Sequence, residues 1–463
     1  MLNSQVPPAS RSPAQPPPWR EVFSGSLGRL AVGLFLLEAT GAIATLVVTT
    51  IMPLITSSLG GIGLYGWALA APGLATVAAI PVTGRAADRY GPVPTLAVML
   101  PVFAGGLILS AAAPTMTVLV AGRLLQGAGA GAQYAVSAGA VAKSFPERHR
   151  SRILALLAAA WLVPGLVGPL LGAVVAQTLG WRWAFVVLLP LVAAAAALVL
   201  PGLRNVPPGQ GAPTPPMRWT ALLAVGSAAV LAGLTHVSLF TAPVVAAGAA
   251  IVFFAMRKLI APSTGVAQGI GRALIAGFLL TFAFFAADGF VPLMLIRVRG
   301  TTVLEASLVV TAATVAWSVG SWWQSRVAGR FTRRALMTGG AAAIAIGILG
   351  LAAGLGPVPL AMPYTFWTLA GLGIGVAYPT LYVITMERAT AGAEATAVSL
   401  VLLLDSLGTS VGSGLGGAAI AVTRSVGGSL STGLLSAFAV ALAASAALIF
   451  TAARFSGRVV APT

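Results

Sequence analysis

Charged residues are scarce in this chain. They make up 8% of its 463 residues, whereas a soluble globular domain carries about 25%. Because so few side chains can be solvated as ions, only a small part of the chain can face water. The composition therefore excludes an ordinary soluble protein.

Cysteine is absent from the chain, and only two histidines are present. Without cysteine there can be no disulfide and no thiolate metal site, and two histidines argue against a histidine-based metal centre. We also find no arrangement of histidine, cysteine or paired carboxylates that suits catalysis. We therefore expect no enzyme activity, no catalytic or metal-binding residues and no cofactor.

Apolar residues are what the chain has in abundance. They make up 58% of the sequence and form long runs, such as residues 96–113 and 336–355. A helix needs roughly 20 apolar residues to cross the bilayer core. The runs are continuous rather than alternating, which argues against a membrane barrel. The sequence thus predicts an all-α membrane protein.

Proline, glycine and charged residues divide this apolar sequence into fourteen candidate spans. We place them at residues 29–55, 63–83, 95–113, 116–142, 152–178, 183–201, 219–235, 239–256, 271–295, 303–324, 335–355, 360–386, 395–422 and 431–452. The seventh and eighth spans are the shortest, lie on either side of His236 and could be interfacial. Without that pair, twelve spans remain.

The basic residues indicate the orientation. With the N-terminus inside, 21 of the 26 lysines and arginines fall on the cytoplasmic side, as the positive-inside rule requires. The net charge of +17 therefore belongs to short cytoplasmic loops rather than to a nucleic-acid surface. We expect both termini in the cytoplasm, with a disordered tail at residues 1–28 and a second tail at 454–463. The Ala-, Gly- and Arg-rich composition suggests a bacterial protein, which would then lie in the cytoplasmic (inner) membrane.

An internal repeat divides the chain into two halves. Residues 126–134, QGAGAGAQY, have a counterpart 244 residues later at 370–378, AGLGIGVAY, and Gly168 corresponds to Gly412 at the same offset. Duplicated halves around a midplane site are typical of secondary transporters. We therefore predict a six-helix bundle at 29–201, a linker with an inserted helix pair at 202–270, and a second six-helix bundle at 271–453.

Three of the nine acidic residues fall inside predicted spans, away from both ends. At 1.5 Å per residue, Glu38 lies about 13 Å into the first span, and Asp405 is about as deep in the thirteenth. Asp288 lies closer to the outer face. Acids within a membrane bundle are costly to keep charged, which suits them to bind and release protons. Glu38 and Asp405 are our candidates for proton coupling, cation binding or both, with Asp288 in reserve; a structural acid is the alternative for each.

The segment GRAADRYG joins the second and third predicted spans. Its aspartate can pair with neighbouring arginines, and its glycines allow a tight turn. It resembles the signature loop of the major facilitator superfamily, G-x-x-x-D-R-x-G-R-[RK], although Pro92 and Val93 replace the two closing basic residues. The resemblance implies the major-facilitator fold and a loop that latches the two halves in the outward-facing state. The latch residues would be Gly84, Asp88, Arg89 and Gly91.

Arg123 and Gln126, in the fourth predicted span, resemble the R-x-x-Q-G motif of the same family. An arginine inside the bilayer is costly and needs a partner. The resemblance implies that Arg123 influences the protonation of a carboxylate on the first helix, and we place Gln126 with it among the candidate coupling or substrate residues. The alternative is an arginine that snorkels to the outer interface.

The fifth predicted span carries closely spaced small residues and a proline. Small residues on one face let two helices approach, and an internal proline kinks a helix. The segment resembles the family's antiporter motif, G-x-x-x-G-P-x-x-G-G, which marks exporters, although Pro164 and Ala173 replace its first and last glycines. A generic packing face is the alternative. The matching residues are Gly165, Gly168, Pro169 and Gly172.

Residues 181–185, WRWAF, follow this span and resemble a segment of the fourteen-span drug:proton antiporter branch. That branch typically carries an acid on the first helix, nine positions before a proline. Here Pro53 is present, but the matching position is Ala44 and the acid is Glu38. This departure leaves the conventional coupling site open.

We therefore predict a secondary active exporter, acting by proton-coupled antiport of small amphipathic or drug-like compounds. Alternating access between the two halves would carry the substrate out as protons move in. The rivals are an exporter of lipid, siderophore or another metabolite, an uptake symporter, and a membrane scaffold or sensor that transports nothing. The expected partners are a small-molecule substrate, protons and the lipid bilayer, with no nucleic acid, and we expect a monomer.

Overall fold

The computed structural model describes residues 19–204, 206, 208, 217–235, 240–259, 270–389 and 394–455. Most of both predicted tails lies outside these residues, as does His236. The described part of the first predicted tail is helical at Trp19–Val22, and the first long helix already begins at Gly25.

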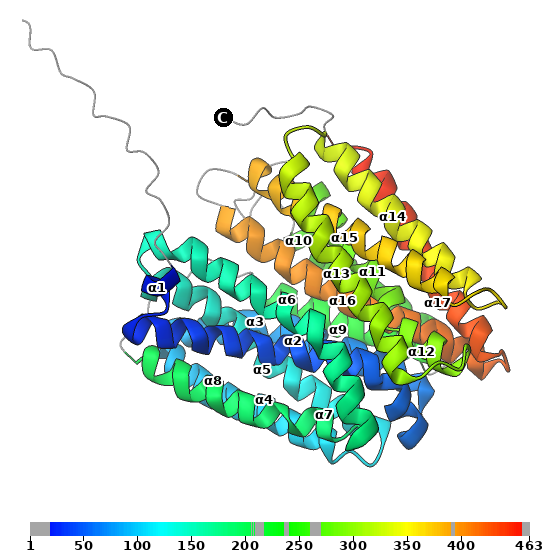
Figure 1. Ribbon diagram of the computed structural model, residues 1–463, viewed down its shortest axis with the longest axis horizontal. Helices are drawn as coiled ribbons and strands as arrows, with labels where there is room; N and C mark the ends of the chain where they lie inside the picture. Colours follow the sequence, from blue (N-terminus) through cyan, green and yellow to red (C-terminus); the bar gives the residue numbers. More distant parts are fainter. Residues whose placement is uncertain are drawn as a thin grey trace, which may run out of the picture.

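The regular elements among the described residues are helices (Figure 1). The helices are α1 Trp19–Val22, α2 Gly25–Leu59, η1 Ile62–Leu64, α3 Tyr65–Tyr90, α4 Pro92–Ala111, α5 Met116–Ser144, α6 Glu147–Thr178, α7 Trp183–Val186, α8 Leu188–Gly202, α9 Met217–Thr235, α10 Thr241–Leu259, α11 Ile270–Asp288, α12 Val291–Arg297, α13 Val303–Val327, α14 Arg333–Ala353, α15 Ala361–Arg388, α16 Glu394–Ser425 and α17 Leu430–Ala452.

Thirteen of the helical segments in the described residues are long and apolar enough to cross a membrane. They include both members of the predicted inserted pair, α9 and α10, at 19 residues each. The remaining predicted span is helix α5, which has 29 residues but carries Arg123, Gln126, Gln133 and several glycines. These residues lower its apolar content, and this is why it falls outside the thirteen.

Hydroxyl side chains mark where several helices begin. Each of four helices is capped by a side-chain oxygen that accepts a hydrogen bond from a backbone N–H in the first turn. The capping residues are Thr115, Thr302, Thr332 and Ser429. Such caps satisfy donors that have no partner within the helix. These caps fix the residues at which α5, α13, α14 and α17 begin.

The two halves repeat the same packing. In the first half α2 packs on α6 and α8, and α5 packs on α3 and α4; in the second half α11 packs on α16 and α17, and α15 packs on α13 and α14. Figure 1 shows the first half in blue to green and the second in yellow-green to red, side by side. This arrangement agrees with the predicted pair of six-helix bundles.

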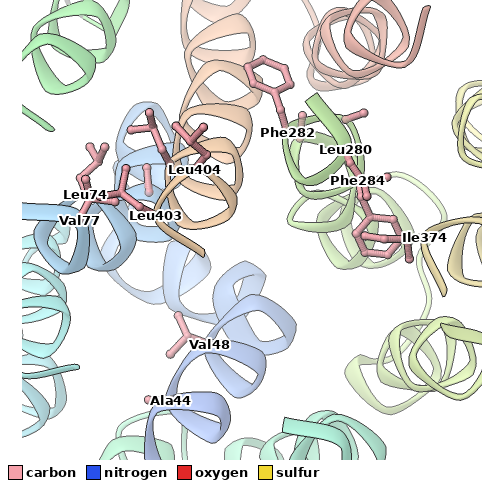
Figure 2. Packing of buried hydrophobic residues seen from close by; sticks show 14 of the residues in the cluster. Ala44, Val48, Leu74, Val77, Leu280, Phe282, Phe284, Ile374, Leu403 and Leu404 are labelled. Carbon is pink, nitrogen blue, oxygen red and sulfur yellow. The ribbon is translucent and has the colours of Figure 1, made fainter. Parts of the chain in front are cut away.

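Two symmetry-related contacts join the halves: α3 packs on α16, and α6 packs on α13. Figure 2 shows the apolar core at the first contact, where Leu74 and Val77 of α3 lie beside Leu403 and Leu404 of α16. The inserted helix α9 packs on α3 and α16 as well, beside this contact. The halves therefore share an apolar seam.

The segment predicted to be the loop between the second and third spans is mostly helical. Helix α3 continues to Tyr90, and only Gly91, with φ of 94°, separates it from Pro92 at the start of α4. Glycine tolerates this backbone conformation, and proline is favoured in the first helical turn. The prediction of a loop at residues 84–91 was therefore wrong, because nothing in this segment interrupts the helix before Gly91.

Candidate functional site

Glu38 lies in the middle of α2, with 7% of its surface exposed. Its carboxyl group faces Ser137 of α5 and Trp161 of α6, and Tyr134 of α5 is close enough to interact with its charge. The rings of Tyr134 and Trp161 stack with centroids 6.3 Å apart. The first half thus surrounds its buried acid with aromatic and hydroxyl groups.

Asp405 lies in α16 and is also 7% exposed. Its Oδ2 accepts hydrogen bonds from the hydroxyls of Tyr378 at 2.7 Å and Tyr382 at 3.2 Å. Its Oδ1 is buried and accepts no hydrogen bond from any described residue. A buried oxygen without a partner is costly, and it leaves this carboxyl one site for a proton or a ligand.

The two acids face a common region between the halves. Tyr134, beside Glu38, and Tyr382, bonded to Asp405, are close enough for their hydroxyl groups to interact electrostatically. Rings of Phe284, Phe285 and Trp317 continue the aromatic cluster from Tyr378, with Trp317 5.6 Å from the Tyr378 ring. We call the two acids, Glu38 and Asp405, the central pair. The side chains that surround them are Tyr134, Ser137, Trp161, Tyr378 and Tyr382.

Part of the central pair's surroundings follows the internal repeat, although the two acids do not occupy equivalent positions. Tyr134 and Tyr378 occupy equivalent positions, and so do Trp161 and Asp405, both at an offset of 244. The repeat already contained the two tyrosines at its last matched position, but apolar spacing alone could not show that they face the acids. Tyr382 carried no such signal in the sequence.

Arg123 is 2% exposed, so it does not snorkel to the outer interface. It donates hydrogen bonds to the carbonyl of Ala44 at 3.1 Å, to the carbonyl of Ala68 at 3.2 Å and to Oε1 of Gln126 at 2.7 Å. It therefore reaches the first long helix through the backbone of Ala44, not through Glu38. These bonds tie α5 to α2 and α3.

Gln126 extends the same network to α4. Its amide nitrogen donates to the carbonyl of Gly106 at 3.1 Å and to Oγ of Ser110 at 2.9 Å. Both of its polar atoms are thus satisfied by the first half. The structure does not bring Arg123 or Gln126 into the central pair.

Asp288 ends α11, where a break at Gly289 and Phe290 separates it from α12. It is 6% exposed, and its Oδ1 accepts a hydrogen bond from the indole of Trp367 at 3.2 Å. Asp405 Oδ1 lies against Gly277 of the same helix, which puts Asp288 about 16 Å further along the helix. Asp288 is therefore separate from the central pair.

Several close contacts join the halves at the end of the bundle near Asp288. The hydroxyl of Tyr65 donates to the carbonyl of Gly289 at 3.1 Å, and its ring lies 5.4 Å from that of Phe290. A Cβ on Gly66 would lie 2.7 Å from Cα of Gly417. We call these five residues the Tyr65 gate. Further out, Arg297 donates to Oγ of Ser57 at 2.7 Å.

The predicted latch residues lie at the opposite end, which we call the basic end because Arg85, Arg89 and Lys143 lie there. Asp88 pairs with Lys143 of α5 at 3.6 Å, and the guanidinium of Arg89 lies over the ring of Tyr90. Gly84 lies two turns before the end of α3, and Gly91 ends it. In this structure Asp88 bonds within its own half.

The predicted antiporter residues pack between helices of both halves. A Cβ on Gly165 would lie 2.6 Å from Cγ2 of Thr314 in α13, and one on Gly172 would lie 2.6 Å from Cγ1 of Val47 in α2. Gly168 also faces Val47, and Pro169 lies inside α6 between these glycines. The face therefore lets α6 approach α2 and the second half at once.

Comparison with known proteins identifies the class. Residues 34–413 match the sequence profile of the Major Facilitator Superfamily. A probable multidrug-efflux transporter of Mycobacterium tuberculosis is 30% identical over 457 residues, covering 92% of this chain and 94% of that protein. An efflux pump of Gibberella moniliformis is 30% identical over 205 residues, covering 44% of this chain and 36% of the pump.

Solved structures show the same fold. The POT family transporter PepTSo superposes with a TM-score of 0.69 at 14% identity, over 92% of this chain and 97% of its own. A bacterial homologue of the human lysosomal transporter Spinster, in an inward-facing and unoccupied conformation, gives 0.67 at 18% identity, over 92% and 96%. The structural matches confirm the predicted fold, and the family match shows a transporter rather than an enzyme. The chain is a multi-pass membrane protein of the major facilitator superfamily, related to multidrug efflux pumps.

Proposed function

We propose that this protein is a proton-coupled antiporter that exports small amphipathic compounds. The observation that carries the proposal is the central pair: one buried acid in each half, both surrounded by aromatic and hydroxyl groups. A charge buried in a membrane bundle is a functional candidate by default. The relationship to probable multidrug-efflux transporters supports export of drug-like compounds.

The coupling follows from competition for the two acids. A cationic or hydrogen-bond-donating substrate gains most from Glu38 and Asp405 when they are charged, whereas a proton neutralises them. Substrate and proton therefore exclude each other at the same groups, and antiport requires this exclusion. Aromatic faces such as that of Trp161 can hold the apolar part of the substrate and attract a cation.

Alternating access then carries the substrate across. The halves touch closely at the Tyr65 gate, while the basic end carries the side chains that the positive-inside rule places in the cytoplasm. We assign the basic end, and with it both termini, to the cytoplasmic side of a bacterial inner membrane. The state described here is therefore closed toward the outside.

The latch and antiporter residues act in this cycle rather than in binding. Asp88 would leave Lys143 and hold the second half when the protein faces outward. Gly165, Gly168 and Gly172 provide the close α6 contacts along which the halves move. Since each half contributes one acid, a monomer contains the complete site.

The test is a flux assay with purified protein in proteoliposomes that carry an imposed proton gradient. Tetraphenylphosphonium, chloramphenicol and a lysophospholipid would serve as cationic, neutral and lipid probes. We expect gradient-driven uptake of a drug probe into inverted vesicles, lost in Glu38→Gln and in Asp405→Asn but kept in Glu305→Gln. Full gradient-driven transport by both central variants would overturn the proposal. Transport of the lysophospholipid alone would show that the substrate is a lipid rather than a drug-like compound.

A further inference from the structure

The internal repeat relates two contacts that differ in one chemical respect. At the offset of 244, Ala44 corresponds to Asp288 and Arg123 to Trp367. In the first half Arg123 donates to the backbone carbonyl of Ala44 at 3.1 Å. In the second half Trp367 donates to the carboxyl of Asp288 at 3.2 Å. The same helix pair is thus bridged by a cation and a carbonyl in one half, and by a neutral donor and an acid in the other.

The surroundings of Asp288 favour its neutral form. The side chain is 6% exposed, and its one hydrogen-bond donor among the described residues is the neutral indole of Trp367, which is itself fully buried against Phe284. Asp288 is also the last residue of α11, where the partial negative charge of the helix end repels an anion. A charged carboxylate here would be buried without a cation.

The charged and titratable groups on the helices packed around Asp288 have other partners or lie elsewhere, with one exception. Tyr65 of α3 is close enough to interact with the charge of Asp288. On α15, the hydroxyl of Tyr364 donates to the carbonyl of Glu305, and the hydroxyls of Tyr378 and Tyr382 donate to Asp405. On α16, Asp405 lies about 16 Å nearer the basic end, and Arg424 lies in the last turn. Arg297 of α12 donates to Ser57. The remaining charged side chains of α14 and α15 stand at the basic end: Arg333, Arg334, Glu387 and Arg388.

The acid adjoins the contact that closes the outer end. Tyr65 of the first half bonds to the carbonyl of Gly289, the residue that follows Asp288. Its ring packs on Phe290, and Gly66 next to it packs on Gly417. Separation of the halves at this point would break the Tyr65 bond and admit water to the break between α11 and α12. Water solvates a carboxylate, so opening favours the charged form and closure the neutral form.

We propose that Asp288 is a proton-binding site distinct from the central pair, and that its protonation holds the Tyr65 gate closed. The proposal rests on the proton-coupled function given above and adds a second site to it. Because closure favours the protonated acid, protonation must favour closure by the same free energy. A proton arriving from outside then closes the gate behind itself, and loss of that proton lets the gate open for substrate release.

The test measures the gate directly, without substrate. The chain has no cysteine, so spin labels at Ser58→Cys and Val426→Cys would report the separation of α2 and α16 at the outer end; both positions are exposed. In the parent protein we expect the longer distance to gain population as the pH rises, by up to about tenfold in the open-to-closed ratio per pH unit, the slope for one proton. In Asp288→Asn the shorter distance should persist at every pH.

Two variants complete the test. Glu305→Gln changes an exposed acid of the outer end in the same way and should keep the parent response. Trp367→Phe removes the indole donor but keeps an aromatic ring against Phe284, so the open population at high pH should rise by roughly tenfold or more. This variant also decides the matter if Asp288→Asn fails to fold.

A pH response that survives in Asp288→Asn, or an unchanged response in Trp367→Phe, would overturn the inference. Neither result would touch the proposed function, because gradient-driven drug uptake is measured separately with the parent protein and the central variants. Absence of that uptake in the parent protein, or full uptake in both central variants, together with an intact gate response, would contradict the exporter proposal instead.

Discussion

Replacement of Arg123 by leucine should destabilise the first half rather than uncouple transport. The guanidinium makes three hydrogen bonds, to Ala44, Ala68 and Gln126, at 3.1, 3.2 and 2.7 Å. The leucine variant would leave two backbone carbonyls, on α2 and α3, without this donor in a buried site. Arg123 is therefore expected to act as a support that holds three helices together.

The magnitude follows from those contacts. A hydrogen bond to a charged group contributes about 1.5–3 kcal/mol, and a buried group left unpaired costs about 1–3 kcal/mol. Because the three bonds share one side chain, their effects are not additive. The loss should amount to about 3–5 kcal/mol, which corresponds to a fall in Tm of about 3–5 °C for a chain of this size.

The assay is thermal unfolding of the purified protein, followed through its tryptophan fluorescence, with Arg182→Leu as the matched control. Arg182 is exposed and donates one hydrogen bond, to the carbonyl of Ala113 at 3.1 Å, so its loss should cost less than about 1.5 kcal/mol. An Arg123→Leu protein with the parent Tm but no proton-coupled transport would refute this reasoning, and would assign Arg123 to the coupling step.

Three further outcomes are expected. Gly66→Ala should shift the Ser58–Val426 spin-label distance toward the open form, because its Cβ would lie 2.7 Å from Cα of Gly417 and overpacking costs about 1–3 kcal/mol. Gly105→Ala is the control, since nothing lies within 4 Å of its Cβ, and it should leave the distance unchanged. Equal responses of the two variants would contradict the gate. Tyr378→Phe removes the 2.7 Å hydrogen bond to Asp405 and should lower the export rate by roughly tenfold. Tyr364→Phe removes a hydrogen bond from the outer end of α15 to the backbone carbonyl of Glu305 and should leave the rate unchanged. Similar rates in both variants would show that the Tyr378 hydroxyl has no part in export. Asp88→Asn breaks a partly exposed ion pair with Lys143 that contributes less than about 1 kcal/mol, so the Tm should stay within about 2 °C of the parent value. Transport should fall, because the latch would lose its charge. A large fall in Tm would instead show that the ion pair is structural.

The sequence was sufficient for the fold because the fold depends on features that are local or periodic. Apolar runs of about 20 residues predict spans wherever they occur, and the repeat at an offset of 244 predicts two bundles of the same design. Helix α5 departs from the apolar rule because Arg123 and Gln126 are satisfied by neighbouring helices, which hydropathy does not register.

The site was only partly predictable. Glu38 and Asp405 could be found because a buried acid is rare and its depth follows from counting residues. Their companions Ser137 and Tyr382 could not, because hydroxyl groups are common in spans and often bond to the backbone of their own helix. The position of Asp288 at a helix break also escaped the sequence analysis, because the apolar run continues across Gly289 and Phe290; the signal that marks the break is Pro292, which has no N–H to donate to the carbonyl of Asp288.

The central claim, that substrate and proton compete for the central pair, is tested most directly by proton release on binding. Tetraphenylphosphonium would be added to the purified, weakly buffered protein in detergent, and the pH change would be followed with an indicator dye. We predict release of protons in the parent protein and in Asp288→Asn, and no release in the double variant Glu38→Gln/Asp405→Asn. Binding of the probe to the parent protein without proton release, or release that persists in the double variant, would contradict the account.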